Sequence, residues 1–267
     1  KAKQKGVVCP DKQWRKIITI EDAERGGANF FDIEMLRLEY SEDEFNNLFL
    51  CLFVDDTKSV FKLSQLEKAF SDIELWEDYK KNATRPFGNN EVWIGYDPSR
   101  TTDAASCVIL APPLKPGGKF RILEKHYWTG QSFQFQANRI KDLCDKFNVR
   151  HIGVDCTGMG MGVFELIKSF YPSAMAIHYG LESKTQLVLK AMDVIQSKRI
   201  EWDAGWTDIP HAFMTIKQTA TKSGQITYSA NRTDATGHAD VAWAIMHALI
   251  NEPINTNKRK STWATAA

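Results

Sequence analysis

The chain after about residue 90 carries a regular succession of apolar runs and amphipathic segments. Three runs come first, over residues 92–97, 104–110 and 120–128, and short stretches rich in proline, glycine and threonine separate them. Runs of this length bounded by turn residues predict β-strands joined as hairpins. Further strands are predicted over residues 152–155, 174–179 and 225–230.

Other segments of this region carry apolar residues at helical spacing. Apolar residues between Ile140 and Phe147 follow the i, i+3, i+4, i+7 pattern, which predicts a helix over residues 133–147. The other helices are predicted over about residues 163–170, 184–197 and 208–221, and from Asp240 onward. Hairpin-linked strands followed by alternating strands and helices predict an α/β fold, with a mixed β-sheet flanked by α-helices in the element order of the ribonuclease H-like fold.

Residues before about 88 follow a different pattern. An acidic helical segment is predicted over about residues 32–47, a strand over 48–54 and a helix over 64–81. The run Pro86-Phe87-Gly88-Asn89-Asn90 predicts a turn and a linker. We therefore expect a linker or the end of a preceding domain over residues 1–88, a second domain over 89–253, and a disordered tail over 254–267.

Three aspartates occupy positions that a sheet edge would bring together. Asp97 and Asp155 each close an apolar strand, and Asp240 lies in the first turn of the last helix. The ends of neighbouring strands converge, and a helix packed across that edge can add a third carboxylate. Clustered carboxylates repel one another unless a cation joins them, and such oxygen ligands suit Mg²⁺ or Mn²⁺. The matching chemistry is phosphodiester cleavage assisted by two metal ions about 4 Å apart.

Two further residues are candidates for the same site, and each aspartate also has an ordinary structural interpretation. His238 precedes the last helix and is a candidate ligand or auxiliary base, and Asp103 opens the second strand and could face the same cation. In contrast, Asp97 is followed by turn residues, and an aspartate in a first helical turn often only complements the helix dipole.

Basic residues near the predicted edge are candidates for contacts with the DNA backbone, although most surface cations are simply solvated. Lys184 opens the helix after the fifth strand and could instead neutralise the acids. The complete set of candidates is Arg100, Lys184, Lys217, Lys222 and Arg232.

The turn after Asp155 is rich in glycine, which raises the question of a phosphate-binding loop. Its spacing is G-x-G-x-G rather than G-x-G-x-x-G, and three hairpin-linked strands precede it, whereas a dinucleotide fold begins with this unit. We expect the glycines to let the backbone pass close to the metal cluster or to DNA. No G-x-x-x-x-G-K-[ST] sequence occurs in the chain, so we expect no P-loop ATPase site within it.

Composition and net charge limit which partners, metal sites and cellular compartments we expect for the chain. The formal net charge is +1, so any DNA-binding face must be local. The five cysteines form no C-x-x-C pair, which argues against a zinc site or a disulfide framework and favours a reducing cytoplasm. No apolar run is long enough to span a bilayer and no signal peptide is visible, so we expect no membrane partner. The missing initiator Met suggests a fragment of a longer protein.

The chain resembles the C-terminal nuclease domain of the large terminase subunit of tailed double-stranded DNA phages. The resemblance covers about residues 90–250 and rests on three motifs: Ile94-Gly95-Tyr96-Asp97-Pro98-Ser99, the run from Ile152 to Gly160, and Gly237-His238-Ala239-Asp240-Val241-Ala242-Trp243-Ala244. Residues 45–56 and 59–61 look like the end of that family's ATPase domain and its linker.

The resemblance implies an endonuclease that cuts concatemeric viral DNA while a P-loop motor packages it. It implies that Asp97, Asp155 and Asp240 bind two Mg²⁺ or Mn²⁺ ions, with His238 and Asp103 as neighbours. The implied partners are double-stranded DNA, an upstream ATPase domain, the small terminase subunit and the portal protein, in the cytoplasm of a bacterial host. The missing P-loop departs from the family pattern and places the motor before Lys1.

Other functions remain open from the sequence alone. The chain could be another ribonuclease H-like nuclease such as a resolvase, or a phosphotransferase of the actin and sugar-kinase type, in which the turn after Asp97 would bind phosphate. Such kinases need two copies of the fold, and one is visible. A non-catalytic DNA-binding module would instead leave the acids scattered.

Overall fold

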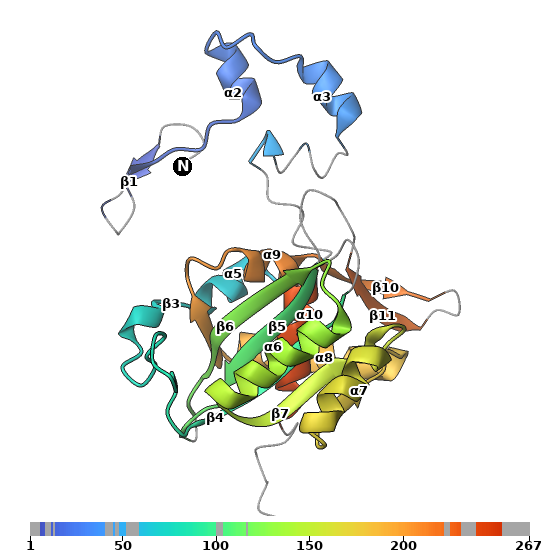
Figure 1. Cartoon of the computed structure of the whole chain (residues 1–267). Helices are drawn as coiled ribbons and strands as arrows, with labels where there is room; N and C mark the ends of the chain where they lie inside the picture. The colour runs from blue at the N-terminus through green and yellow to red at the C-terminus, as the bar shows by residue number, and fades with distance from the viewer. Residues whose placement is uncertain are drawn as a thin grey trace, which may run out of the picture. The chain divides into compact units, whose positions relative to one another are not determined.

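The structure is a computed structural model, and it divides into two compact units, Lys1–Lys58 and Ser59–Ala267. The described residues are 6–8, 12, 14–40, 45, 48–51, 59–99, 104–115, 117–221, 225–230 and 239–252. Figure 1 shows the elements of both units. Each unit is described by itself. Within the described residues, no helix combines the length and apolar character that a membrane crossing requires.

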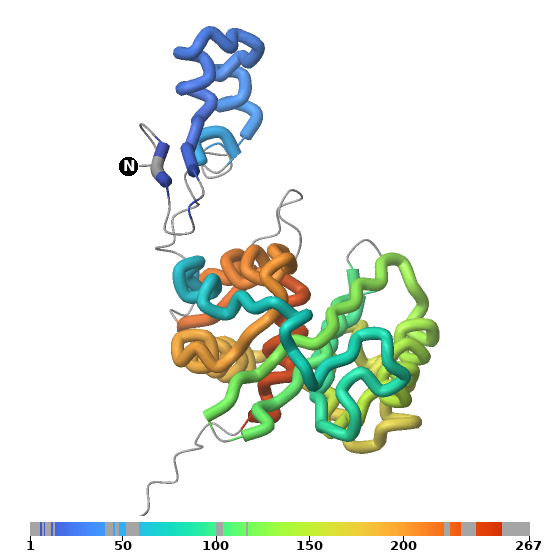
Figure 2. Tube along the Cα trace, turned by 90° about the vertical axis from the view of Figure 1, so that its left-hand side faces the viewer, coloured from blue at the N-terminus to red at the C-terminus, as the bar shows by residue number. Residues whose placement is uncertain are grey.

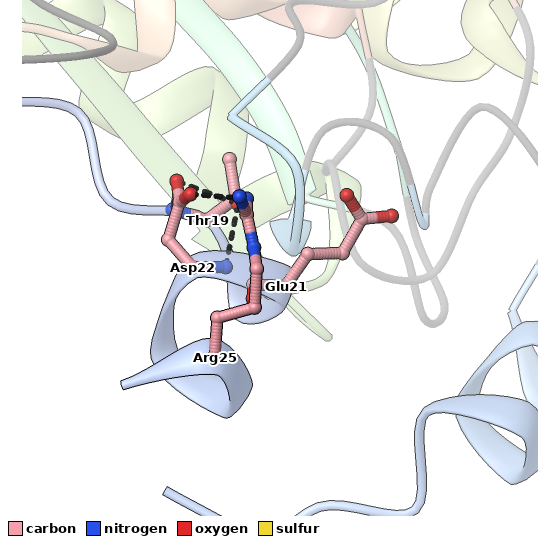
Figure 3. A network of polar contacts seen from close by, with 4 residues as sticks. All are labelled: Thr19, Glu21, Asp22 and Arg25. Atoms are coloured by element: carbon pink, nitrogen blue, oxygen red, sulfur yellow. Dashed lines mark hydrogen bonds and ion pairs between the residues drawn. The ribbon is translucent and has the colours of Figure 1, made fainter. Parts of the chain in front are cut away.

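The first unit contains short elements. Strands β1 (Val7–Val8) and β2 (Trp14–Arg15) pair antiparallel, and helices α2 (Ile20–Arg25) and α3 (Ile33–Glu39) follow. Helix α2 begins with a capping box, in which the Asp22 backbone N–H donates to Thr19 Oγ1 over 3.1 Å and the Thr19 backbone N–H donates to Asp22 Oδ2 over 3.1 Å (Figure 3). Arg25 completes the network through an ion pair with Asp22 of 2.6 Å. This helix was not predicted, because only Ile20 of its residues is buried.

Two predictions for the first unit differ from the structure. Of the helix predicted over residues 32–47, the structure shows α3 over Ile33–Glu39. Residues 41–44 and 46–47 of this prediction lie outside the described residues. The predicted strand over residues 48–54 is wrong for 48–51, which form a helical end and a turn. The Phe49 backbone N–H donates to the Phe45 carbonyl over 3.0 Å, and the two rings pack 5.2 Å apart. Aromatic residues four positions apart therefore favour a helical turn here.

The second unit is built on one seven-stranded sheet with the order β3-β9-β6-β5-β4-β7-β8. Strand β5 runs antiparallel to both of its neighbours, and the other neighbouring pairs are parallel. The strands are β3 (Phe70–Ser71), β4 (Glu91–Asp97), β5 (Ala104–Ala111), β6 (Phe120–Thr129), β7 (Asn148–Asp155), β8 (Met175–Ile177) and β9 (Ile200–Asp203). The predicted mixed sheet flanked by helices is confirmed.

Helices cover both faces of this sheet, which explains why the central strands are almost continuously apolar. Ile94 packs with α6 (Phe133–Lys146) and α7 (Gly160–Phe170) on one face. Trp93 packs on the other face with α8 (Leu181–Gln196), α9 (Asp208–Met214) and α10 (Asp240–Leu249). The two helical layers lie on opposite sides of the strands in Figures 1 and 2.

Helix α10 lies directly on the backbone of the central strands. A Cβ atom at Gly95 of β4 would lie 1.8 Å from the Ala244 carbonyl oxygen, and one at Gly153 of β7 would lie 2.4 Å from the His247 carbonyl oxygen. Every residue from Val241 to Leu249 is buried, as expected for a helix that is apolar all round. Glycine at two neighbouring strand positions therefore fixes where α10 crosses the sheet.

Some elements of the second unit were predicted wrongly. The helix expected over residues 208–221 ends at Met214, and β10 (Ile216–Ala220) then pairs antiparallel with β11 (Ile226–Ala230). The helix expected over 64–81 is a short α5 (Leu63–Leu66), the 3-10 turns Glu67–Ala69 and Ile73–Leu75, and β3 between them. Strand β9 was not predicted, because only four residues form it.

Residues 59–88 belong to the second unit and pack with its sheet. Strand β3 pairs with β9, and Phe61, Leu66 and Ala69 belong to the core that α10 also enters. The compact units consequently divide at residues 58 and 59, earlier than the domain boundary predicted after residue 88.

Candidate active site

Two of the three predicted acids end neighbouring parallel strands. Tyr96 of β4 is level with Val154 of β7, so the residues that follow them, Asp97 and Asp155, close the two strands side by side. Asp155 is also level with Ile177, the last residue of β8. The carboxyl ends of three parallel strands therefore meet at one edge of the sheet.

Tyr179 shows that the third acid reaches the same edge. Burial raises the pKa of Tyr179 well above its usual value, and the charges of Asp97, Asp155 and Asp240 each raise it further. Tyr179 follows β8, whereas Asp240 begins α10, which lies across β4 and β7. The charges of three carboxylates, from two strand ends and one helix start, therefore all act on the Tyr179 hydroxyl at this edge.

Asp155 is the most deeply placed of these acids. Its side chain accepts a hydrogen bond of 2.7 Å from the Thr157 backbone N–H. Burial raises the pKa of Asp155, and the Thr157 hydrogen bond and the charges of Lys184 and His178 oppose this shift. The hydroxyl of Thr157 accepts a hydrogen bond of 2.9 Å from the Tyr179 backbone N–H, so the turn after β7 is tied to the end of β8. A bound cation would offset the cost of keeping this desolvated carboxylate ionised.

The glycines after Asp155 serve the close packing of this turn. Gly158 has a φ of +65°, in the left-handed region that favours glycine. A Cβ atom at Gly160 would lie 2.0 Å from the Asp155 carbonyl oxygen and 3.1 Å from Cγ of Pro98, the residue after Asp97. The backbone of this turn therefore packs against the ends of β4 and β7, and its close passage to a metal cluster or to DNA stays a prediction.

A buried chain of hydrogen bonds connects the Tyr179 hydroxyl to the backbone of β4 through His247. Nδ1 of His247 lies 3.1 Å from the Tyr96 carbonyl oxygen, and Nε2 of His247 lies 2.8 Å from the Tyr179 hydroxyl. Burial lowers the pKa of His247 to about 3, so the imidazole is neutral at physiological pH. A carbonyl can only accept, so Nδ1 carries the hydrogen and Nε2 accepts from the tyrosine. Sequence reasoning missed this pair; a histidine inside an otherwise apolar helix was the available signal.

Lys184 lies at the same edge. Its ammonium is 4.9 Å from the centre of the Tyr179 ring and 5.7 Å from that of the Trp243 ring, and its charge acts on Asp155. Such cation–π contacts hold a lysine side chain in one region while its ammonium keeps its charge. Trp243, a buried residue of α10, therefore also borders the site. Lys217 lies on β10, in the separate two-stranded sheet.

Five candidate residues cannot be placed. Arg100, Asp103, Lys222, Arg232 and His238 lie outside the described residues.

The donor chemistry of the gathered acids fits a hard divalent cation, since carboxylate oxygens are the ligands that Mg²⁺ and Mn²⁺ prefer. Within the ranges that the structure describes, however, no three His, Cys, Asp or Glu side chains are grouped closely enough to hold one metal ion. Asp97, Asp155 and Asp240 therefore share a location without forming a closed coordination shell.

Comparison with known families gives two matches along the chain. The family model of the terminase RNase H-like domain matches residues 94–252. The family model of the N-terminal part of the terminase large subunit, of the T4-like virus type, matches residues 5–68.

Two curated relatives are similar over almost the whole chain. The "Terminase, ATPase subunit" of Escherichia phage P2 is 54% identical over 93% of this chain and 42% of its own length. The "Probable terminase, ATPase subunit" of Haemophilus phage HP1 is 46% identical over 96% of this chain and 42% of its own length. The chain thus spans well under half the length of these relatives.

Solved structures show the same fold at low identity. The large terminase nuclease of thermophilic phage G20c, with bound magnesium, has a TM-score of 0.58 and 18% identity, over 73% of this chain and 98% of that chain. The HK97 bacteriophage large terminase has a TM-score of 0.52 and 11% identity, over 93% of this chain and 55% of that chain.

Proposed function

The chain belongs to the terminase RNase H-like domain family, and we propose that it is a metal-dependent endonuclease that cuts concatemeric viral double-stranded DNA during genome packaging. One observation carries the proposal: Asp97 and Asp155 close neighbouring parallel strands at one sheet edge, and the charges of Asp97, Asp155 and Asp240, from three separate elements, all raise the pKa of Tyr179 at that edge. The large terminase nuclease of phage G20c has been solved with bound magnesium and with bound cobalt, which supports a divalent cation as the cofactor.

We assign distinct tasks to the residues of this edge. Asp97, Asp155 and Asp240 would hold Mg²⁺ or Mn²⁺, which when bound activates water and stabilises charge on the phosphate. The buried chain from Tyr96 through His247 keeps the Tyr179 hydroxyl fixed at this edge. His238 and Asp103 stay candidates for an auxiliary base and a further ligand.

Binding of DNA is proposed to rest on a few local cations. Lys184 is the described candidate at the acid edge, and the other candidates are Arg100, Lys217, Lys222 and Arg232. Contacts to phosphates carry no sequence information, and each contributes about −0.9 to the slope of log affinity against log salt. We therefore expect weak, salt-sensitive and sequence-tolerant binding by this chain alone.

The packaging context is part of the proposal. The two curated relatives are named as ATPase subunits, whereas this chain contains no G-x-x-x-x-G-K-[ST] sequence. We propose that an ATPase domain upstream of these residues, the small terminase subunit and the portal protein bring the DNA to the site in the host cytoplasm. A kinase-like phosphotransferase is the alternative, and saturable ATP binding at micromolar concentration would favour it.

Plasmid digestion tests the central proposal. The chain is incubated with supercoiled plasmid and Mg²⁺, Mn²⁺ or excess EDTA, and nicked and linear products are quantified. We expect products only with a divalent ion, and more with Mn²⁺, because Mn²⁺ accepts less ideal geometry and nitrogen ligands. Cleavage that persists in excess EDTA would contradict the proposal.

A further inference from the structure

A second lysine has the same aromatic surroundings as Lys184. The ammonium of Lys125, on β6, lies 5.3 Å from the centre of the Tyr127 ring and 5.4 Å from that of the Trp206 ring. Each of the two lysines is therefore held over one tyrosine and one tryptophan. Such a cage restricts the side chain and leaves the ammonium able to bind an anion.

The strand register places this second lysine on the flank of the acids opposite to Lys184. Asp97 of β4 is level with Ser106 of β5, which is level with Tyr127 of β6. Residues directly opposite one another point to the same face of a sheet. Tyr127 therefore lies on the same face as Asp97, two strand spacings or about 10 Å away along the same edge. The charge of Asp240 also contributes to the raised pKa of Tyr127, after burial and the contact with Asp208.

Lys125 differs from Lys184 in having a carboxylate partner. Asp208, the first residue of α9, forms an ion pair with Lys125 and accepts a hydrogen bond of 2.5 Å from the Tyr127 hydroxyl. Burial alone would raise the pKa of Asp208, but the hydrogen bonds from Lys125 and Tyr127 lower it overall. Asp208 is therefore ionised at neutral pH and cancels the charge of Lys125.

The carboxylate and the lysine differ in exposure. The side chain of Lys125 is 16% exposed, whereas that of Asp208 is 41% exposed. Asp208 is therefore the more solvent-accessible partner of this ion pair. A phosphate that reached this flank would meet a carboxylate first, and it could bind Lys125 and Tyr127 only by displacing Asp208.

We propose that Lys125 is a masked phosphate-binding residue on the β6 side of the acids: Asp208 neutralises it and limits DNA affinity, and Lys125 binds a phosphate of the DNA backbone only when the Asp208 carboxylate is displaced or loses its charge. This inference rests on the proposed nuclease function, because it takes the acid edge as the place where the DNA backbone crosses. With Lys184 on the other flank, the two caged lysines bracket the acids along the sheet edge.

Binding without cleavage tests the inference. A fluorescent DNA duplex is titrated with protein in EDTA across a salt series, and anisotropy gives the affinity. Asp208→Asn keeps an acceptor for the Tyr127 hydroxyl and removes the charge that masks Lys125. We expect several-fold tighter binding near 0.1 M salt and a log–log salt slope steeper by about 0.9, which corresponds to one added phosphate contact.

A matched variant separates this effect from general electrostatics. Glu201 forms an ion pair of 3.0 Å with Lys119, and both residues lie at the opposite end of β6 and β9 from the acids. Glu201→Gln makes the same change in net charge and likewise leaves a lysine without its carboxylate partner. We expect it to change the affinity and the salt slope much less than Asp208→Asn does.

A double substitution completes the design. Lys125→Gln should change binding little in the parent, where Asp208 masks the lysine, and should remove the gain in the Asp208→Asn background. The inference is overturned if Asp208→Asn binds no better than Glu201→Gln, or if its gain survives the loss of Lys125. Melting temperatures are measured first, and Asp208→Ser replaces Asp208→Asn if the latter unfolds. Because the assay needs no cleavage, its outcome is independent of whether the chain cuts DNA.

Discussion

Gly95 of β4 lies against the Ala244 carbonyl of α10 so closely that a Cβ atom on the glycine would come within 1.8 Å of that oxygen. The contact sets the depth of α10 on the sheet and, through it, the position of Asp240 at the first turn of that helix. A structural glycine in the middle of a strand thus determines the geometry of the candidate active site.

Gly95→Ala should consequently disrupt the second unit as well as the site. The added methyl group must push α10 away from β4, which overpacks a filled core and costs about 3 kcal/mol or more. We expect a clear loss of stability in urea unfolding and a loss of cleavage. Gly180→Ala is the control, because its Cβ atom would find its nearest neighbour at 3.9 Å. Equal stability of the two variants would contradict the close approach of α10.

Asp97→Asn, Asp155→Asn and Asp240→Asn should each abolish cleavage without unfolding the protein. Burial raises the pKa of Asp155, so its ionised form costs stability as pH rises through that pKa. The metal-free Asp155→Asn variant should therefore melt at the same temperature as the parent or higher at neutral pH. Asp145→Asn, on the exposed side of α6, should cleave normally. A marked loss of melting temperature in all three variants would indicate structural roles instead.

His247 should make the protein sensitive to mild acid. Its pKa is about 3 in the folded chain and about 6.5 when exposed, so the unfolded chain binds an extra proton between these values. Stability from this residue is present above about pH 6.5 and is lost as pH falls toward 3, on the order of a few kcal/mol. Burial also lowers the pKa of His151, which adds to the same trend.

Urea unfolding between about pH 7 and pH 5 measures this dependence. His247→Gln should be less stable at pH 7, by about 1–3 kcal/mol for the two lost hydrogen bonds, and its stability should change less with pH. His211→Gln alters an exposed histidine and should keep the pH dependence of the parent. An unchanged slope in His247→Gln would show that other groups cause the acid sensitivity.

Lys184→Gln should remove one phosphate contact from DNA binding. The slope of log affinity against log salt should become shallower by about 0.9, and cleavage should fall. Lys168→Gln is the control, since Lys168 lies over the Phe164 ring on α7, on the other face of the sheet. If both variants keep the salt slope of the parent, the proposed role of Lys184 is wrong.

Several features could be predicted from local pattern alone. The strands ending in Asp97 and Asp155 were found because an acid after an apolar run is visible without any partner. The last helix was found because its apolar residues extend over three turns. The wrong predictions also came from local pattern. Strand β9 was missed because it has only four residues, and residues 64–81 were assigned to a helix although their apolar residues form no continuous stripe at helical spacing.

The sequence by itself determined the candidate acids, the order of strands and helices from β4 through α8, and the absence of a G-x-x-x-x-G-K-[ST] sequence within the chain. Only the tertiary structure brought Asp240 to the strand ends, because that contact depends on α10 lying against Gly95 and Gly153. The pairing of His247 with Tyr179, and of Asp208 with Lys125, was likewise decided by packing. These partners are separated by tens of residues, and periodicity along a chain contains no information about which buried side chains will meet across a sheet.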